Sequence, residues 1–369
     1  MTTSRMINEN MTVTPLGEKE WEPFNVFESG ILSIKTTGSG VDGIRIKSGN
    51  DENVPYITRS DTNNGIARFV SETNYEYGFD EGGCIIVGLD TQTAFWQPGR
   101  FITGQNIHII TADWLNMESA MFLIPLLRSQ MRAKFNWGGN GATLKRMRKL
   151  AIMLPVTGSG EPDYTYMADY VRQRRMTMLE KYRAYAEKRI TALGDSATIP
   201  ALEEKEWHAF AVNQVFLSIQ RGKRLKNADH IPGCMPYVSS TALNNGVADW
   251  IDATEGTRVF EDCISLANSG SVGSAFYEPF AFVASDHITH LKRPDTNGYI
   301  YLFLTCALEK QKANFNFSRE INDSRINKLR IMLPVNDANE PDYKYMEQYA
   351  RNMMIHKLRQ YLTFIESKA

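Results

Sequence analysis

The sequence has no long run of apolar residues. The longest, Met121 to Leu127, is far shorter than the roughly 20 residues that a helix needs to cross a bilayer. The N-terminal residues also lack the apolar segment that is typical of a secretory signal. We therefore expect a cytoplasmic protein without a membrane partner.

Cysteine and histidine are both scarce. The 369 residues include four cysteines, none in a Cys-x-x-Cys pair, and six scattered histidines. This pattern argues against a disulfide scaffold and against a metal site. We expect His287 to pack in a core or to form hydrogen bonds. We expect free, buried thiols at Cys84, Cys234, Cys263 and Cys306.

Common catalytic motifs are missing as well. The sequence contains no Walker phosphate loop and no Gly-x-Ser-x-Gly nucleophile elbow. The scattered histidines do not suggest a catalytic triad by their spacing. We therefore predict no catalytic residue in this chain.

Neither sign of charge is in excess. Lysine and arginine number 41 against 42 acidic residues, which gives a net charge of −1 and by itself argues against a nucleic-acid partner. The distribution is uneven, however, because the segment from Arg221 to Lys226 carries four cations in six residues. A second basic cluster begins at Lys145 and Arg146. Such segments suit phosphate or base-edge contacts, although a solvated basic loop remains an alternative.

What the sequence does contain is a duplication. Pro55-Tyr56-Ile57 and the following Asn63-Asn64-Gly65 recur as Pro236-Tyr237-Val238 and Asn244-Asn245-Gly246. Glu161-Pro162-Asp163-Tyr164 recurs as Glu340-Pro341-Asp342-Tyr343. These matches predict two diverged copies of one unit of about 180 residues, too long for a solenoid repeat.

Each copy combines a globule with a long helix. Short strand-like segments punctuated by Gly and Asn, with helices expected near 117–133 and 298–313, predict an α+β fold. Pro162 and Asp163 suit the first turn of the long helix that follows, as do Pro341 and Asp342. The predicted domains are a first globular domain (1–160), a central long spacer helix (161–195), a second globular domain (196–339) and a second spacer helix (340–369).

Both long helices carry one apolar stripe. We predict that the stripes pair antiparallel, with pseudo-twofold symmetry, as a spacer between the domains. The alternative is that each helix packs only on its own globule. The pairing residues would be Met167, Val171, Met178, Tyr182, Met346, Ala350, Met354 and Leu358.

Polar and basic loops supply the candidate DNA contacts, because small hydrogen-bonding side chains and glycine let a backbone approach another molecule closely. In the second copy they are Lys223, Arg224, Lys226, Ser239, Ser240, Asn244, Asn245, Ser269, Ser271 and Ser274. In the first copy they are Arg59, Ser60, Asn63, Asn64, Thr91, Gln92, Thr93, Lys145 and Arg146.

The order of these motifs resembles that of the DNA specificity (S) subunits of restriction–modification systems, type I and especially type IIB. The resemblance covers almost the whole chain. The first copy departs from it, because Lys35 to Gly40 replace the basic Gly-Lys-Arg-Leu element. The pieces that carry it are Trp207-x-x-Phe210, Gly222-Lys223-Arg224-Leu225, Pro236 to Ser240, Asn244 to Val247, Gly270 to Gly273, Phe276-Tyr277, Ala284 to His287, and the Leu-Pro-Val…Glu-Pro-Asp-Tyr-x-Tyr-Met element.

This resemblance implies a non-catalytic subunit whose two domains each read half of a bipartite double-stranded DNA site. It also implies partners: methyltransferase or fused methyltransferase–nuclease subunits, two per chain, that hold S-adenosylmethionine and the Mg²⁺ for cleavage. Two alternatives stay open. One is a stand-alone sequence-specific DNA-binding protein. The other is a nuclease built on Pro341-Asp342 with Glu366 and Lys368.

Overall fold

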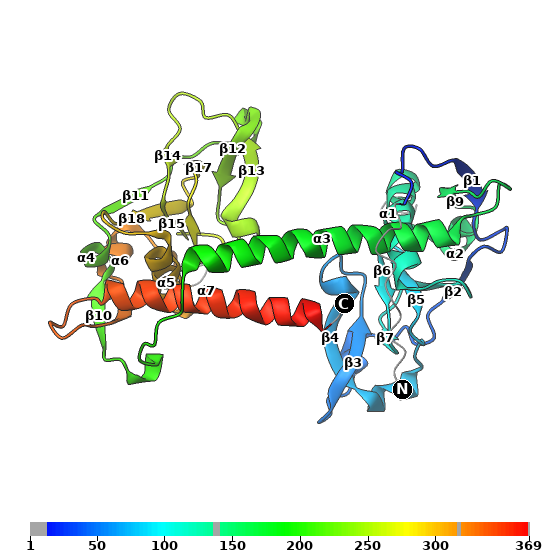
Figure 1. The fold of residues 1–369 in the computed structure, drawn as a ribbon, viewed down its shortest axis with the longest axis horizontal. Coiled ribbons are helices and arrows are strands. Elements are labelled where there is room, and N and C mark those ends of the chain that lie inside the picture. The colour runs from blue at the N-terminus through cyan, green and yellow to red at the C-terminus, as the bar shows by residue number, and fades with distance from the viewer. Residues whose placement is uncertain (1–12, 136–140, 316–318, 368–369) are drawn as a thin grey trace. The chain divides into compact units, whose positions relative to one another are not determined.

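The protein consists of two compact units, Met1–Lys181 and Tyr182–Ala369. A computed structural model describes residues 13–135, 141–315 and 319–367 (Figure 1). The outer ends of the predicted domains, 1–12 and 368–369, therefore lie outside the described residues. Helix α3, Tyr164–Leu193, begins in the first unit and ends in the second.

The first unit is a mixed α+β globule whose strands form three small sheets. Their orders are β2-β8-β5-β6, β4-β3-β7 and β1-β9. The elements before α3 are β1 (Trp21–Asn25), β2 (Ser33–Thr36), β3 (Glu52–Ile57), β4 (Ile66–Ser71), β5 (Cys84–Gly88), β6 (Ala94–Gln97), β7 (Ile102–Thr103), β8 (Ile107–Thr111), α1 (Met117–Lys134), α2 (Leu144–Met147) and β9 (Ala151–Pro155).

The second unit repeats this topology with one additional strand, β14, and its sheets are β11-β18-β15-β16, β13-β12-β17-β14 and β10-β19. Its elements are β10 (Trp207–Ala211), α4 (Val212–Val215), β11 (Ser218–Arg221), β12 (Pro232–Val238), β13 (Val247–Ile251), β14 (Val259–Phe260), β15 (Cys263–Ala267), β16 (Ala275–Glu278), β17 (Phe282–Ala284), β18 (Ile288–Lys292), α5 (Gly298–Glu309), α6 (Asp323–Lys328), β19 (Arg330–Pro334) and α7 (Tyr343–Glu366).

The central strands of each unit are buried on both faces. All five residues of β5 and all five of β15 are buried, which explains their nearly continuous apolar sequences. In each unit the first strand pairs antiparallel with the last strand before the long helix, from Trp21 opposite Pro155 and from Trp207 opposite Pro334. The chain therefore enters and leaves each globule at the same place.

The predicted internal helices are present. Helix α1 begins at Met117, after Asn116, which forms a capping box with Ser119. Helix α5 begins at Gly298 behind the side-chain cap of Asn297, but it ends at Glu309, earlier than the predicted 313. A short 3-10 turn at Lys312–Asn314 follows it.

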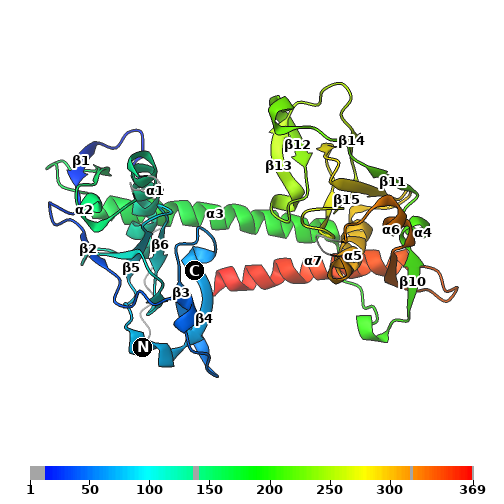
Figure 2. The ribbon, with the colours of Figure 1, turned by 180° about the vertical axis from the view of Figure 1, so that it is seen from behind.

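The antiparallel helix pair lies within the second unit, where the last part of α3 packs against α7. The ring of Tyr182 lies 4.6 Å from that of Tyr361, and Arg189 contacts the sulfur of Met354 at 3.8 Å. As the residue number rises along α3, the number of the contacted residue on α7 falls, so the two helices run in opposite directions (Figures 1 and 2). Buried around this contact are Ala186, Leu193, Ile355 and Leu358.

The predicted pairing stripe was wrong at its two N-terminal ends. Met167 is in the core of the first globule with Val171 packed on it, and Met346 is in the core of the second. Met178 is 65% exposed. One apolar stripe thus serves two purposes, because its first turns anchor the helix to its own globule and only later residues, such as Leu358, contact the other helix.

The thiols were also predicted only in part. Cys84 and Cys263 are free and buried at the start of β5 and β15, and burial raises the pKa of each thiol to about 12. Cys234 and Cys306 are free but exposed, which corrects the expectation of four buried thiols. Within the described ranges, no helix is both long and apolar enough to cross a membrane.

Candidate nucleic-acid interface

The two Asn-Asn-Gly turns have the same conformation in both units. They join β3 to β4 and β12 to β13, and each has consecutive positive φ angles: 50° and 56° at Asn63 and Asn64, and 50° and 53° at Asn244 and Asn245. Asn tolerates this left-handed region better than most residues. All four side chains are exposed, although the Asn64 amide donates to Trp96 O at 2.9 Å.

The basic loop of the second unit lies beside the segment 284–287. Lys223 N donates to Ala284 O at 3.0 Å. A Cβ atom at Gly222 would clash with the carbonyl oxygen of Ser285, so glycine is required for this close approach. Lys223, Arg224 and Lys226 are all exposed, as a DNA contact requires.

A polar cavity of about 570 Å³ opens next to this loop. Three predicted contact residues line it: Arg224, Lys226 and Ser239. Sequence reasoning missed most of the other lining side chains, because they come from separate segments. The remaining lining residues are Leu225, Asn227, His230, Tyr237, Ala248, Asp249, Asp286 and His287.

The cavity holds fixed charges of both signs. His230 Nδ1 lies 2.6 Å from Asp249 Oδ2, and the backbone N–H of Trp250 donates to Asp249 Oδ1 at 2.9 Å. These hydrogen bonds lower the pKa of the Asp249 carboxyl, so it stays ionised at neutral pH. Burial raises the pKa of Tyr237, whose hydroxyl therefore stays protonated. With cations nearby, the cavity can bind a planar group that carries both donors and acceptors.

The serine-rich loop is only partly available for contact. Ser240 and Ser271 are half-buried. Ser269 is buried and hydrogen-bonds to His287, and Ser274 is 1% exposed and accepts a hydrogen bond from Lys312 Nζ at 2.9 Å. The predicted contacts at Ser269 and Ser274 are therefore corrected: their hydroxyls bond the loop to His287 and Lys312 of other segments. His287 forms hydrogen bonds but is not in a core.

In the first unit, the predicted loop and α2 lie together. Ala142 N donates to Leu89 O at 2.9 Å, which holds the start of α2 beside the loop that follows β5. Arg59 pairs with Asp90 in that loop. Lys145 and Thr91 are exposed. Arg146 donates a hydrogen bond to Gly141 O at 3.0 Å, and Gln92 donates one to Asp90 O at 2.9 Å. The Ser60 hydroxyl lies 2.8 Å from the Thr62 hydroxyl.

Thr93 does not belong to this exposed group. Its side chain is 2% exposed, and its hydroxyl lies 3.0 Å from that of Thr91. The predicted DNA contact at Thr93 is corrected accordingly, because the hydroxyl is used inside the turn.

The nuclease alternative is contradicted by the position of Asp342. Its carboxylate caps α7 by accepting from Tyr345 N at 3.0 Å and pairs with Lys205 at 2.9 Å. Glu366 is the last residue of this 24-residue helix, about 35 Å away at 1.5 Å per residue, so the two cannot share a metal ion. The third residue of the motif, Lys368, lies outside the described residues.

Asp163 occupies the same position in the first unit. It accepts from Tyr166 N at 2.9 Å and pairs with Lys19 at 2.8 Å. The Pro-Asp pairs are thus helix starts in both copies. Throughout the described part of the chain, His, Cys, Asp and Glu side chains form no group of three that could hold a metal ion.

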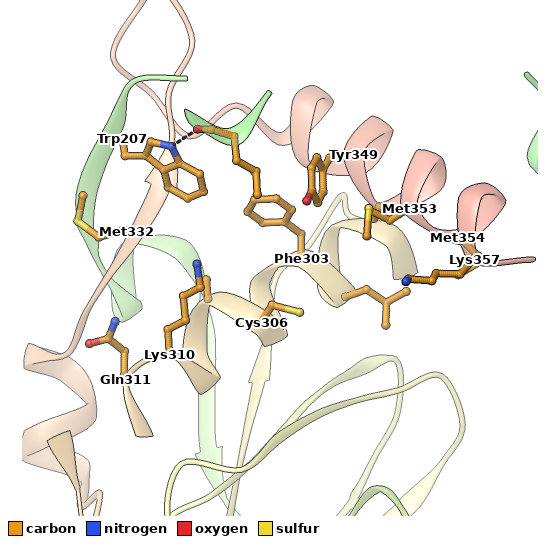
Figure 3. A pocket seen from close by; sticks show the side chains of 14 residues that line it. Trp207, Phe303, Cys306, Lys310, Gln311, Met332, Tyr349, Met353, Met354 and Lys357 are labelled. Carbon is orange, nitrogen blue, oxygen red and sulfur yellow. Dashed lines mark hydrogen bonds between the residues drawn. The ribbon is translucent and has the colours of Figure 1, made fainter. Parts of the chain in front are cut away.

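A separate feature of the second unit is an apolar groove of about 780 Å³ between α5 and α7 (Figure 3). Trp207 stacks on Phe303 with ring centroids 6.2 Å apart, and Phe303 meets Tyr349 edge-on at 5.7 Å. We call these three rings the aromatic cluster. Exposed apolar side chains beside it are Leu302, Met332 and Met353, and the predicted Ala350 and Met354 also line the groove.

The first unit repeats this aromatic cluster. Trp21 stacks on Phe122 at 6.0 Å, and Phe122 meets Tyr170 edge-on at 5.7 Å. Met121 and Met153, at the positions that correspond to Leu302 and Met332, are exposed as well. Exposed apolar side chains thus lie beside the same three rings in both copies.

Comparison with known proteins decides the family. The type I restriction–modification DNA specificity domain matches residues 20–181 and again 204–363. The chain belongs to this family. It is a specificity subunit with two recognition domains in tandem, and the predictions of a duplicated α+β fold and of a recognition subunit rather than an enzyme are confirmed.

Individual proteins are similar to this chain in sequence or in fold. The specificity subunit S.BcgI of a type II restriction enzyme from Heyndrickxia coagulans is 27% identical over 321 residues, covering 86% of this chain and 90% of that protein. The S subunit of a type I system from M. genitalium has a similar fold, with 15% identity, a TM-score of 0.53, and coverage of 97% and 96% of the two chains. The HsdS subunit from Thermoanaerobacter tengcongensis aligns over 96% and 92%, with 16% identity and a TM-score of 0.32.

Proposed function

We propose that this specificity subunit reads a bipartite double-stranded DNA site, one half with each unit. The observation that carries the proposal is that the two units share one fold but differ in their exposed loops. Both units have corresponding sheets, apart from the additional strand β14 in the second unit, and the same Asn-Asn-Gly turns. The basic segment Gly222–Leu225, by contrast, is specific to the second unit. Such a pair of surfaces suits two different half-sites.

Helix α3 is a suitable spacer, because it is continuous across the boundary between the units. Its 30 residues correspond to about 45 Å at 1.5 Å per residue. That length slightly exceeds one turn of B-DNA, about 34–36 Å. We propose that α3 and α7 set the distance between the two half-sites.

The two aromatic clusters are the proposed docking surfaces for methyltransferase or fused methyltransferase–nuclease subunits, one on each unit. Two equivalent apolar surfaces support a stoichiometry of two partners per chain. The partners would supply S-adenosylmethionine, Mg²⁺ and all catalytic groups, including those for base flipping. Since the substrate is cellular DNA, we propose a cytoplasmic location.

The test is methylome sequencing of cells that express this chain with its cognate methyltransferase. We expect methylation within one motif made of two constant parts separated by a fixed number of unspecified bases. Replacing residues 1–160 with the corresponding segment of another family member should change one part only. A control without the specificity subunit should show no methylation in the motif.

Two results would contradict the proposal. A continuous motif, or a change in both halves after exchange of one domain, would exclude one half-site per unit. Failure to co-purify with any methyltransferase, combined with sequence-specific binding by the chain alone, would favour the stand-alone DNA-binding alternative.

A further inference from the structure

The two units carry opposite charges at the same position beside the same tyrosine. In the first unit, Tyr56 on β3 lies opposite Arg68 on β4. In the second unit, Tyr237 on β12 lies opposite Asp249 on β13. Each of these strand pairs continues into the Asn-Asn-Gly turn, and the pairing register is the same. Arg68 and Asp249 are therefore equivalent residues.

A second position shows the reverse exchange. The Tyr56 hydroxyl donates to Val41 O at 2.8 Å, and the Tyr237 hydroxyl donates to Leu225 O at 3.3 Å. The residue after each acceptor is Asp42 in the first unit and Lys226 in the second. Each tyrosine is thus flanked by one acid and one base, but the two charges have changed places between the units.

We propose that this exchange gives the two half-sites different bases. Arg68 would read a guanine in the half-site of the first unit, and Asp249 would read the amino group of a cytosine or an adenine in that of the second. Guanine offers two acceptors, O6 and N7, in the major groove, whereas cytosine N4 and adenine N6 are donors that suit a carboxylate. This inference rests on the proposed function.

Asp249 has the geometry that a base-reading carboxylate needs. Its side chain is 51% exposed, yet His230 Nδ1 and the Trp250 N–H fix its two oxygens. The His230 side chain is only 9% exposed and lines the same cavity. Its Nε2 atom is buried and has no hydrogen-bond partner within the described part of the chain.

The charges around the cavity favour a base edge over a phosphate. Asp249 and Asp286 both line it, and two carboxylates would repel a phosphate group. Arg224 and Lys226 line it as well and can contact the flanking backbone. A base edge, which presents donors and acceptors side by side, matches this mixture of signs.

Arg68 is held in a similar way. One of its terminal nitrogens donates to Gly43 O at 2.7 Å, and the guanidinium lies 5.8 Å from the centroid of the Tyr56 ring. The residue is exposed. Because a guanidinium has five N–H donors, this anchoring leaves enough of them to pair with both acceptors of a guanine.

The experiment is selection from a randomised duplex library with the full chain in complex with its methyltransferase, followed by sequencing of the bound fraction. Asp249→Arg should change the preferred base at one position of one half-site from cytosine or adenine to guanine. Arg68→Asp should make the opposite change in the other half-site. We expect a change in base preference of about 10-fold or more at each position.

Two further variants serve as controls. Asp337→Arg makes the same charge change at an exposed turn of the second unit, away from the cavity, and should leave both halves of the motif unchanged. Asp249→Asn keeps the shape of the side chain and adds a donor, so it should weaken discrimination at that one position. It tests the proposal even if Asp249→Arg does not fold.

Three outcomes would overturn the inference. If wild-type protein selects a bipartite motif but the charge-exchange variants bind with the same preferences, these positions do not read bases and the proposed function stands. If Asp249→Arg strengthens binding to all sequences equally and steepens the salt dependence, the position contacts phosphate. If wild-type protein selects no bipartite motif, the proposed function itself fails.

Discussion

Replacing Glu278 by glutamine should stabilise the second unit above neutral pH. Glu278 is fully buried on β16. The Ser265 hydroxyl donates to its Oε1 at 2.8 Å, but its Oε2 has no hydrogen-bond partner among the described residues. Burial outweighs the serine hydrogen bond and raises the pKa of the carboxyl from 4.5 to about 7.

The sign of the effect follows from proton linkage. Below pH 4.5 the carboxyl is protonated in both the folded and the unfolded chain, and it costs no stability. Between pH 4.5 and about 7 the unfolded chain ionises first, so the folded state loses stability as the pH rises. Above pH 7 the carboxyl is ionised in both states, and the loss of stability stays constant at about 3 kcal/mol. This value is about 1.4 kcal/mol for each pH unit that separates the pKa of 4.5 from the pKa of about 7.

The first unit supplies the replacement. At the equivalent position on β6, Gln97 is buried and donates its amide to Asn64 O at 3.0 Å. The residue equivalent to Asn64 is Asn245. We therefore expect the amide of the Glu278→Gln variant to donate to Asn245 O and to keep its oxygen for Ser265.

Urea unfolding followed by tryptophan fluorescence would measure this effect. At pH 4.5 the Glu278→Gln variant and the wild-type protein should have similar unfolding free energies, and at pH 8.5 the variant should be more stable by up to about 3 kcal/mol. The reciprocal control, Gln97→Glu, should be destabilised most at high pH. A difference between Glu278→Gln and wild type that is independent of pH would refute the reasoning, because it would mean that Glu278 is not held protonated.

Four other variants test the remaining conclusions. Asp342→Ala and its counterpart Asp163→Ala should each lower the unfolding free energy by about 1 kcal/mol through loss of a helix cap. Metal-dependent DNA cleavage by the isolated chain that Asp342→Ala abolished would revive the nuclease alternative. Alanine at both Lys223 and Arg224 should weaken DNA binding and reduce the salt slope by about 2, and an unchanged slope would exclude phosphate contacts there. Insertion of four residues after Met178 should lengthen the preferred spacer by about two base pairs, and unchanged spacing would exclude the spacer role.

The parts of the fold that depend on local chemistry could be predicted from the sequence. Helix α1 begins at Met117, as predicted, and the Asn-Asn-Gly turns adopt the positive φ angles that their residues permit. Because the sequence is duplicated, each of these signals occurs in both copies. The long helices were equally visible, because Pro-Asp starts precede uninterrupted periodic segments.

The arrangement of the site could not be predicted in the same way. His230, Asp249 and Asp286 come from three segments that only strand pairing and loop packing bring together. Ser274 and Thr93 were mistaken for surface contacts, because a polar residue in a loop can equally form hydrogen bonds within the protein. The repeat contained a signal that could have located the site. Aligning Tyr56 with Tyr237 makes Arg68 equivalent to Asp249 and shows where the two copies differ in charge.

The pairing of β1 with β9, and of β10 with β19, has an evolutionary consequence. Since the first and last strands of each globule are neighbours, everything between them can be exchanged without moving the points where the chain joins the long helix. Two recombination crossovers, one before β1 and one after β9, would transfer a complete globule in one event. A lineage could then acquire a new half-specificity while its two long helices stay as they were.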